Sequence, residues 1–167
     1  RFGLGYAPNT FNALREHMRS LGYHDEEMAE AFLCGRNRSG KGYFDYFRGR
    51  IMFPIIDNFG NVIAFGGRAI GDVQPKYLNS SDTPVFKKSR NLYSLNFART
   101  CCSEELILCE GYMDVIGVNL AGLSNAVATL GTALTTDQAR IMAKYTKKVV
   151  IAYDSDGAGT AATKRAI

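Results

Sequence analysis

Acidic residues follow two apolar segments in the last third of the sequence. Glu110 follows the run 106–109, and Asp154 and Asp156 follow the run 148–153. Clustered carboxylates repel one another unless a cation joins them. Mg²⁺ prefers such oxygen ligands, and two Mg²⁺ ions can clamp the attacking and leaving oxygens of a phosphoryl displacement. These residues therefore predict a magnesium site, which Mn²⁺ can also fill.

Asp114 is expected to support this site. It lies four residues after Glu110 in a segment with helical character, so its side chain should project back toward the same edge. Each acid also has a simpler interpretation. Asp156 could cap a helix that begins near residue 157, and Glu110 could be a solvated loop residue. The combination of E-G after one strand and D-x-D-G after another favours the metal site.

The elements that must position these acids alternate from about residue 104. Expected strands are 106–109, 125–130 and 148–153, and expected helices are 112–121, 137–145 and a last one from about 157. Strands and helices that alternate with short connections predict a parallel sheet covered on both faces. The carboxyl ends of such strands share one edge, so Glu110 and Asp154 should meet there.

The N-terminal part of the sequence is more mixed. It predicts helices over 9–20 and 26–34, the second capped by Asp25, then a loop over 35–42, and strands over 43–47, 49–56, 62–70 and 76–79 with a turn at 57–61. The expected fold class is α/β. A mixed α+β subdomain over residues 1–103 should precede a Rossmann-like, parallel-sheet subdomain over residues 104–167.

Composition excludes several classes of protein. The chain has 167 residues, of which 46% are hydrophobic and 22% charged, with a net charge of +4, so a folded protein that tolerates a polyanion is expected. Its four cysteines form no C-x-x-C motif, which argues against a zinc site. Free thiols suit a reducing cytoplasm, and no apolar run approaches the length of a membrane span. The missing initiator Met and an end inside a helical pattern suggest a fragment.

Three segments of the sequence have some similarity to other phosphate- or metal-binding motifs. Gly35-x₄-Gly40-Lys41 resembles a phosphate-binding loop but lacks the following Ser or Thr. The segment from Asp154 is not an EF-hand, because Ala158 occupies the next ligand position. V-V-I-A-Y-D-S-D-G also resembles the first motif of haloacid-dehalogenase-type phosphatases. That motif normally opens a domain, whereas only 11 residues follow Asp156 here.

Motifs along nearly the whole chain resemble those of one family. E-G-Y-M-D at 110–114, A-x-L-G-T at 128–132 and D-S-D-x-A-G at 154–159 resemble the toprim domain of bacterial replicative DNA primases of the DnaG type. Toprim folds also occur in topoisomerases, nucleases and recombination mediators. A second set of motifs, in the N-terminal part of the sequence, resembles the polymerase core of these primases. These motifs are R-F-x-L-G-Y-A-P at 1–8, F-R-G-R-I-M-F-P-I at 47–55, G-G-R at 66–68, P-K-Y-L-N-S at 75–80 and F-x-K at 86–88, followed by Leu92-Tyr93.

The resemblance implies a DNA-directed RNA polymerase that makes short RNA primers by two-metal nucleotidyl transfer. It implies Glu110, Asp154 and Asp156 as catalytic and metal-binding carboxylates, with Asp114 as a further metal ligand and Glu110 as general base. It also implies a basic surface for nucleotide and nucleic acid. The residues of that surface would be Arg48, Arg50, Arg68, Lys76, Tyr77, Asn79 and Lys88, with Tyr93 near it.

The implied partners are a single-stranded DNA template, ribonucleoside triphosphates and the RNA–DNA hybrid product. Replicative helicase and single-strand-binding protein would be contacted through parts of the family's proteins that this sequence lacks. The implied location is the bacterial cytoplasm, at the nucleoid and replication fork, without a membrane. Since a further aspartate motif of the family is also missing, the 167-residue piece is expected to be nearly inactive alone.

Two alternatives remain open from the sequence. The chain could be a toprim module that binds nucleic acid without catalysis, which would need no metal. It could also be the phosphatase noted above, in which Asp154 would become a covalent aspartyl-phosphate.

Overall fold

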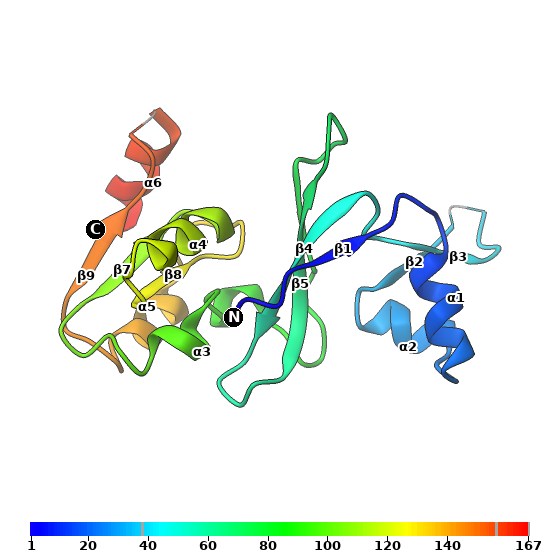
Figure 1. Cartoon of the computed structure of the whole chain (residues 1–167), viewed down its shortest axis with the longest axis horizontal. Helices are drawn as coiled ribbons and strands as arrows, with labels where there is room; N and C mark the ends of the chain where they lie inside the picture. The colour runs from blue at the N-terminus through cyan, green and yellow to red at the C-terminus, as the bar shows by residue number, and fades with distance from the viewer. Residues whose placement is uncertain (38, 156, 167) are drawn as a thin grey trace. The chain divides into compact units, whose positions relative to one another are not determined.

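The computed structural model describes residues 1–37, 39–155 and 157–166, and it confirms a mixed α/β chain (Figure 1). The chain forms two compact units. The first comprises Arg1–Pro54 and Ile63–Phe86, and the second comprises Ile55–Val62 and Lys87–Ile167. The second unit therefore includes the tip of a hairpin as well as the C-terminal part. The subdomain boundary at residue 103 stays a prediction.

The first unit contains most of a four-stranded sheet with the strand order β1-β4-β5-β6. Its strands are β1 (Gly5–Ala7), β4 (Arg50–Ile56), β5 (Val62–Ala69) and β6 (Tyr77–Asn79). Pairing is antiparallel between β1 and β4 and between β5 and β6. In the turn after β4, the Asp57 carboxylate accepts backbone N–H bonds from Phe59 (2.8 Å) and Asn61 (2.9 Å). The predicted hairpin is confirmed, and strand β1 was missed.

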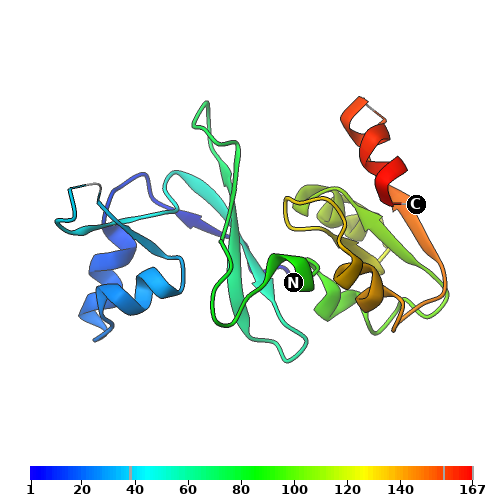
Figure 2. The same cartoon turned by 180° about the vertical axis from the view of Figure 1, so that it is seen from behind.

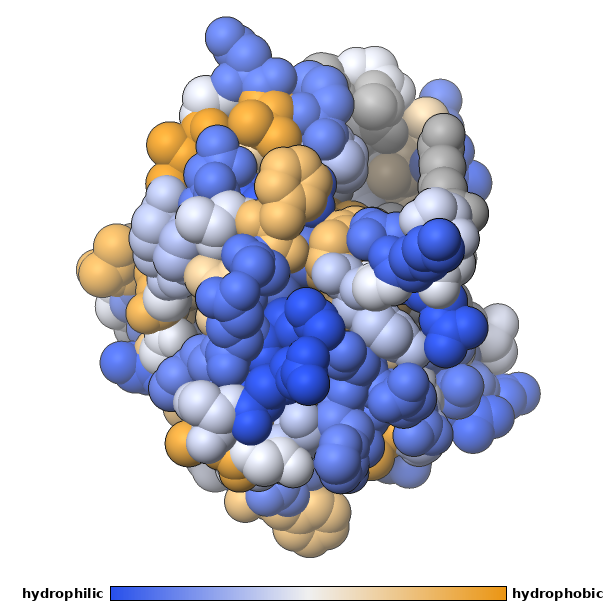
Figure 3. Space-filling view, turned by 90° about the vertical axis from the view of Figure 1, so that its right-hand side faces the viewer, coloured by the Kyte–Doolittle hydropathy of each residue, from blue (hydrophilic) through white to orange (hydrophobic). Residues whose placement is uncertain are grey.

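Two short helices and a second hairpin complete the first unit. They are α1 (Ala13–Ser20), α2 (Asp25–Glu30), β2 (Cys34–Arg36) and β3 (Tyr43–Asp45), with β2 antiparallel to β3. The surface at this end of the unit is mostly hydrophilic, with separate hydrophobic patches (Figure 3).

The helices predicted over 9–20 and 26–34 are shorter in the structure. The first helix begins at Ala13, with Asn12 at its N-cap, so it does not start beside Pro8. The second ends early because Phe32 adopts a φ of 57°, outside the helical region, and its ring stacks on Tyr46 at 4.2 Å. The loop predicted over 35–42 is also partly wrong, because its first two residues belong to strand β2. His24, not Asp25, holds the N-cap position of α2.

A buried carboxylate fastens α1 to this hairpin. Asp45 is only 2% exposed and accepts backbone N–H bonds from Leu14 at 2.8 Å and Arg15 at 3.0 Å. Helix N-termini leave such N–H groups without intrahelical partners, and the Asn12 side chain does not cap this helix. Burial, followed by the charge of Asp45, raises the pKa of the adjacent Cys34 thiol to about 12.

The second unit is built on a parallel sheet with the order β8-β7-β9 (Figure 2). Its strands are β7 (Leu106–Cys109), β8 (Ala126–Ala128) and β9 (Val149–Ala152). Its helices are the 3₁₀ turn η1 (Lys88–Arg90), α3 (Leu95–Ala98), α4 (Tyr112–Leu120), α5 (Thr136–Met142) and α6 (Gly157–Ala166). The predicted order of strands and helices is confirmed, whereas η1 and α3 were missed.

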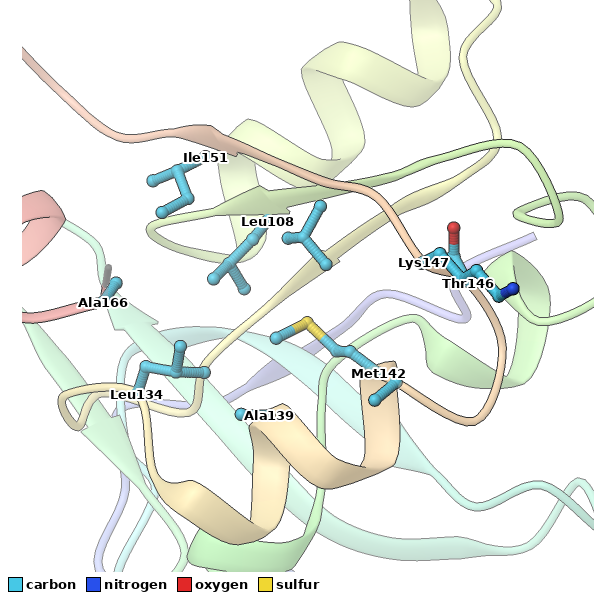
Figure 4. Close-up of a pocket in the computed structure, with 10 residues that line it drawn as sticks. Leu108, Leu134, Ala139, Met142, Thr146, Lys147, Ile151 and Ala166 are labelled. Atoms are coloured by element: carbon cyan, nitrogen blue, oxygen red, sulfur yellow. The ribbon is translucent and has the colours of Figure 1, made fainter.

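Strand β7 is covered on both faces. Leu106 and Leu108 join a buried cluster with Val127 and Met142, on the side where α5 lies. The alternate residues of β7 point to the opposite face, which α4 covers. Figure 4 shows α4 and α5 on opposite sides of the sheet.

Strand β9 departs from the prediction of two covered faces. Val149 and Val150, whose side chains point to opposite faces, are each 38% exposed, and β9 lies at one end of the strand order β8-β7-β9. No helix in the part of the chain that the structure describes is long and apolar enough to cross a membrane.

Replacing Asp45 with Ala should leave the backbone N–H groups of Leu14 and Arg15, at the start of α1, without their buried hydrogen-bond acceptor. We expect the free energy of unfolding of the first unit to fall by about 2–3 kcal/mol, with a smaller loss for Asp45→Asn, which keeps one oxygen. Urea unfolding followed by circular dichroism measures this. Asp72→Ala, in an exposed turn, is the control, and equal losses for Asp45→Ala and Asp72→Ala would contradict the role of Asp45.

The Arg15–Asp25 ion pair should make stability depend on pH. Nε and Nη2 of Arg15 each lie 2.7 Å from an Asp25 oxygen. These bonds lower the Asp25 pKa below its ordinary value of 3.8, against the opposing effect of burial. A lowered pKa stabilises the fold above the ordinary value, and the benefit is lost as pH falls through the folded-state pKa.

Asp25→Asn should therefore reduce the free energy of unfolding at about pH 7, and the difference from the unmodified chain should shrink toward about pH 3. Urea midpoints measured across this range test the expectation. A difference that stays constant with pH would show that the carboxylate charge is not involved.

Candidate functional site

Glu110 and Asp154 meet at the carboxyl edge of the parallel sheet. Strand β7 ends directly before Glu110, and its last residue, Cys109, pairs with Ala152 at the end of β9. The backbone N–H of Asp154 donates to Oε2 of Glu110 at 3.4 Å. Both residues are exposed. The structure thus brings together two acids that lie far apart in the sequence.

Asp114 lies beside the same end of β7. Its Oδ2 accepts the backbone N–H of Gly111 at 2.9 Å, so it caps the first turn of α4. Its negative charge also acts on Cys109, whose thiol pKa is raised to about 11, mainly by burial and secondly by Asp114. One carboxylate oxygen of Asp114 is therefore used by its own helix, and the residue is near the edge where Glu110 lies.

Asp156 falls outside the described residues, so its predicted place is not tested. Among the residues that are described, no group of three or more His, Cys, Asp or Glu side chains is arranged to hold a metal ion. Glu110 and Asp154 nevertheless offer exposed carboxylate oxygens at one edge. Such hard donors fit Mg²⁺, which binds through one or two carboxylates and keeps waters and phosphate oxygens.

A cavity of about 370 Å³ opens beside Glu110. Its other lining residues are Thr129, Gly131, Thr132, Ala133, Leu134, Tyr153, Ala162, Arg165 and Ala166. The sequence motif at 128–132 contributes two hydroxyl groups and a glycine with φ of 75° directly after β8. The rule that placed Glu110 at a strand end could have identified Thr129 and Thr132 as well.

Arg165 was missed by the sequence analysis. It comes from α6 and provides a cation in the lining of the cavity that contains Glu110. No short motif marked this position. Tyr153 lines the same cavity, and its pKa is raised by burial and then by the negative charge of Glu110.

A larger cavity of about 530 Å³ lies between α5 and the sheet (Figure 4). Leu108, Leu134, Met142 and Ile151 point into it, and Lys147 is the charged residue of its described lining. The described lining of this cavity includes no carboxylate, so these residues do not supply the chemistry expected at the strand ends.

The predicted basic residues of the first unit include two arginines that influence one another. The guanidinium of Arg48 lies 4.3 Å from the ring centre of Phe11 and 5.4 Å from that of Phe44. Its Nη1 is buried and has no hydrogen-bond partner within the described residues. Burial, and then the charge of Arg48, lowers the pKa of Arg50. This arrangement suits an anion.

Arg50 itself is only 3% exposed. Its Nη1 donates to the backbone carbonyls of Gly67 (3.3 Å) and Lys76 (3.5 Å), so it holds neighbouring chain segments together. Arg68 pairs with Tyr77 across β5 and β6, and Asn79 pairs with Gly66. Lys76 and Tyr77 are exposed, and Arg68 and Asn79 are half-buried. Their contacts with nucleic acid stay predictions.

Lys88 belongs to the second unit, in the 3₁₀ turn η1, and is half-buried. Tyr93 lies further inside this unit. It is 3% exposed, its backbone pairs with Ala128, and its ring meets that of Tyr112 edge-on at 4.7 Å. Tyr93 therefore supports the core beside β8.

Comparison with known proteins agrees with this architecture. Residues 1–99 match the family model described as DNA primase catalytic core, N-terminal domain, and residues 107–167 match the model described as Toprim-like. Since the first match alone covers more than half of the chain, the chain belongs to the DNA primase catalytic core family. The resemblance to DnaG-type primases is confirmed.

Relatives and solved structures support the same family. DNA primase of Clostridium acetobutylicum is 50% identical over 166 residues, covering 99% of this chain and 28% of the relative. The crystal structure of a DNA primase domain from Pseudomonas aeruginosa matches with a TM-score of 0.92 and 43% identity, over 99% of this chain and 52% of that one.

A DnaG primase catalytic domain solved bound to single-stranded DNA matches with a TM-score of 0.87 and 38% identity, over 99% of this chain and 52% of that one. The chain thus spans a little over a quarter of the curated relative and about half of these solved chains.

Proposed function

We propose that this chain forms the core of a DNA-directed RNA polymerase that makes short RNA primers on single-stranded DNA. The observation that supports this most is the meeting of Glu110 and Asp154 at the carboxyl edge of the parallel sheet, in a chain of the primase core family. Ribonucleoside triphosphates are the proposed substrates, and an RNA–DNA hybrid is the product.

The carboxylates are proposed to hold the metal that the reaction needs. Glu110 and Asp154, with Asp156, would be the ligands, and Asp114 would support them from α4. The chemistry supplied by bound Mg²⁺ is activation of the attacking 3′-hydroxyl and stabilisation of the leaving pyrophosphate. Glu110 would also accept the proton of that hydroxyl. The N–H bond from Asp154 helps to orient the Glu110 carboxylate for these roles.

Positive charge is proposed to bind the phosphates of substrate, template and product. Arg48 has a buried nitrogen with no partner among the described residues, which favours an anionic ligand. Arg165 lies in the cavity beside Glu110 and could contact a triphosphate there. In the first unit, Arg68 and Lys76, with Tyr77 and Asn79, would add further groups for nucleic acid, and the buried Arg50 would hold the segments that carry them. In the second unit, Lys88 would contribute a further positive charge. Affinity for DNA should fall as salt rises.

The single-stranded DNA bound to the DnaG catalytic domain mentioned above supports a similar template here. We further propose that the protein acts in the cytoplasm, at the replication fork, with helicase and single-strand-binding protein as partners of the longer protein. The family match does not favour a non-catalytic toprim module or a phosphatase.

Replacing Glu110 with Gln, or Asp154 with Asn, in the full-length protein should reduce primer synthesis at least ~100-fold. Each change removes a charged metal ligand and keeps the shape of the side chain, and Glu110→Gln also removes the proposed proton acceptor. Incorporation of labelled ribonucleotides on single-stranded DNA measures this, and circular dichroism checks the fold. Glu104→Gln removes an exposed acid of the same unit and should leave synthesis unchanged. Near-normal synthesis by both site variants would refute the assignment.

Mn²⁺ should bind at the acidic edge in crystals soaked with Mn²⁺ and a ribonucleoside triphosphate. We expect anomalous density next to Glu110 and Asp154, since Mn²⁺ shares the preference of Mg²⁺ for carboxylate oxygens. Crystals of Asp154→Asn, soaked in the same way, should show weaker density. Density elsewhere in the molecule, and none at these two residues, would overturn the proposed metal site.

A further inference from the structure

One buried side chain fastens the basic segment Lys87–Arg90 to helix α5. Gln138 is completely buried, and its Nε2 donates to two backbone carbonyls, those of Lys88 at 3.0 Å and Asn91 at 2.9 Å. Its Oε1 accepts the backbone N–H of Thr135 at 3.0 Å. Both ends of the amide are therefore engaged. All of these residues belong to the second unit.

A second bond reinforces this attachment. Thr135 is the N-cap of α5, and its Oγ1 donates to the carbonyl of Ser89 at 2.8 Å while accepting the N–H of Gln138 at 3.2 Å. Consecutive carbonyls of the basic segment are thus tied to the start of α5. Arg90 also pairs with Asp137 at 3.1 Å, but both side chains are exposed, so this pair contributes little.

The attached segment is unusually rich in positive charge. Lys87, Lys88 and Arg90 lie within four residues, and Lys87 and Arg90 are exposed. Lysine and arginine neutralise phosphates and supply most of the affinity of proteins for nucleic acid. A loop that is already ordered loses less conformational entropy when it binds. Holding this short segment in one conformation should therefore strengthen its contacts with phosphate.

Packing alone does not account for Gln138. An apolar side chain of similar length would fill the same space, and burying an amide is costly unless its hydrogen bonds are made. Nε2 donates to backbone carbonyls and not to side chains. Its hydrogen bonds therefore fix the backbone conformation of residues 88–91. Its effect on ligands would act through the segment, because Gln138 itself has no exposed surface.

We propose that Gln138 is a positioning residue, which fixes the basic segment Lys87–Arg90 in the conformation that binds nucleic-acid phosphates. This inference rests on the proposed function, in which Lys88 contacts nucleic acid. It extends that function because the conformation of the basic segment would depend on a residue of helix α5 that is not part of the acidic edge.

The test compares Gln138→Glu with Gln138→Met in the full-length protein. The first puts a carboxylate oxygen against two carbonyls, and the second keeps the length of the side chain and removes both donors. Hydrogen–deuterium exchange should rise in the peptide containing residues 87–91. Affinity for a labelled single-stranded DNA oligonucleotide should fall about 5–10-fold at low salt, and the salt slope should be reduced by about 1.

Leu106→Val is the matched control, since it removes buried volume at the end of β7 remote from Glu110 and deletes none of the bonds that Gln138 and Thr135 make to the segment. It should lower the melting temperature without changing DNA affinity or exchange at 87–91. If it weakens DNA binding as much as the Gln138 variants do, the effect is one of general stability and the proposal fails.

A double variant separates this inference from the proposed function. Lys88→Ala alone should weaken DNA binding, and adding Gln138→Met should then cause little further loss, because both act through one segment. Weakening by Lys88→Ala but not by Gln138→Met would overturn the role of Gln138 and leave the proposed function standing. If neither variant weakens binding, the assignment of Lys88 is wrong and the inference falls with it.

Discussion

Parallel pairing of β7 with β9 is the constraint on which the candidate site depends. Parallel strands end at the same edge, so the residues that follow them are brought together however far apart they lie in the sequence. Burial of every residue of β7 keeps this register, because a slip by one residue would reverse the side chains that face α4 and α5. Glu110 and Asp154 therefore meet as a consequence of packing in the core.

Each unit also uses a buried polar side chain to hold a helix N-terminus against another segment. In the first unit, the Asp45 carboxylate binds the first N–H groups of α1. In the second, the Gln138 amide binds carbonyls of the basic segment. Such side chains are costly to bury unless fully hydrogen-bonded, so they specify one arrangement of the chain instead of merely adding stability.

Charge is distributed as phosphate chemistry requires. Carboxylates lie at the sheet edge of the second unit, and Arg165 lines the cavity beside Glu110. In the first unit, burial and then the charge of Arg48 lower the pKa of Arg50, and like charges held close together favour an anion that would relieve their repulsion. Acidic ligands for a cation and basic groups for phosphates are both needed for nucleotidyl transfer.

Much of the second unit could be predicted from sequence, because alternating apolar strands and helices report local periodicity directly. Leu106–Cys109 was identified with its observed bounds, and the strand-end rule brought Glu110 and Asp154 together. The sequence could not reveal β2, since Cys34–Arg36 is too short for a pattern and forms a strand only by pairing with β3. Nor could it reveal the burial of Arg50 or Tyr93, the partial exposure of β9, or the attachment of the basic segment by Gln138. These features arise from contacts between residues distant in the chain, so the sequence by itself determined the elements and their chemical groups, and only tertiary packing decided which groups are buried and which partners they have.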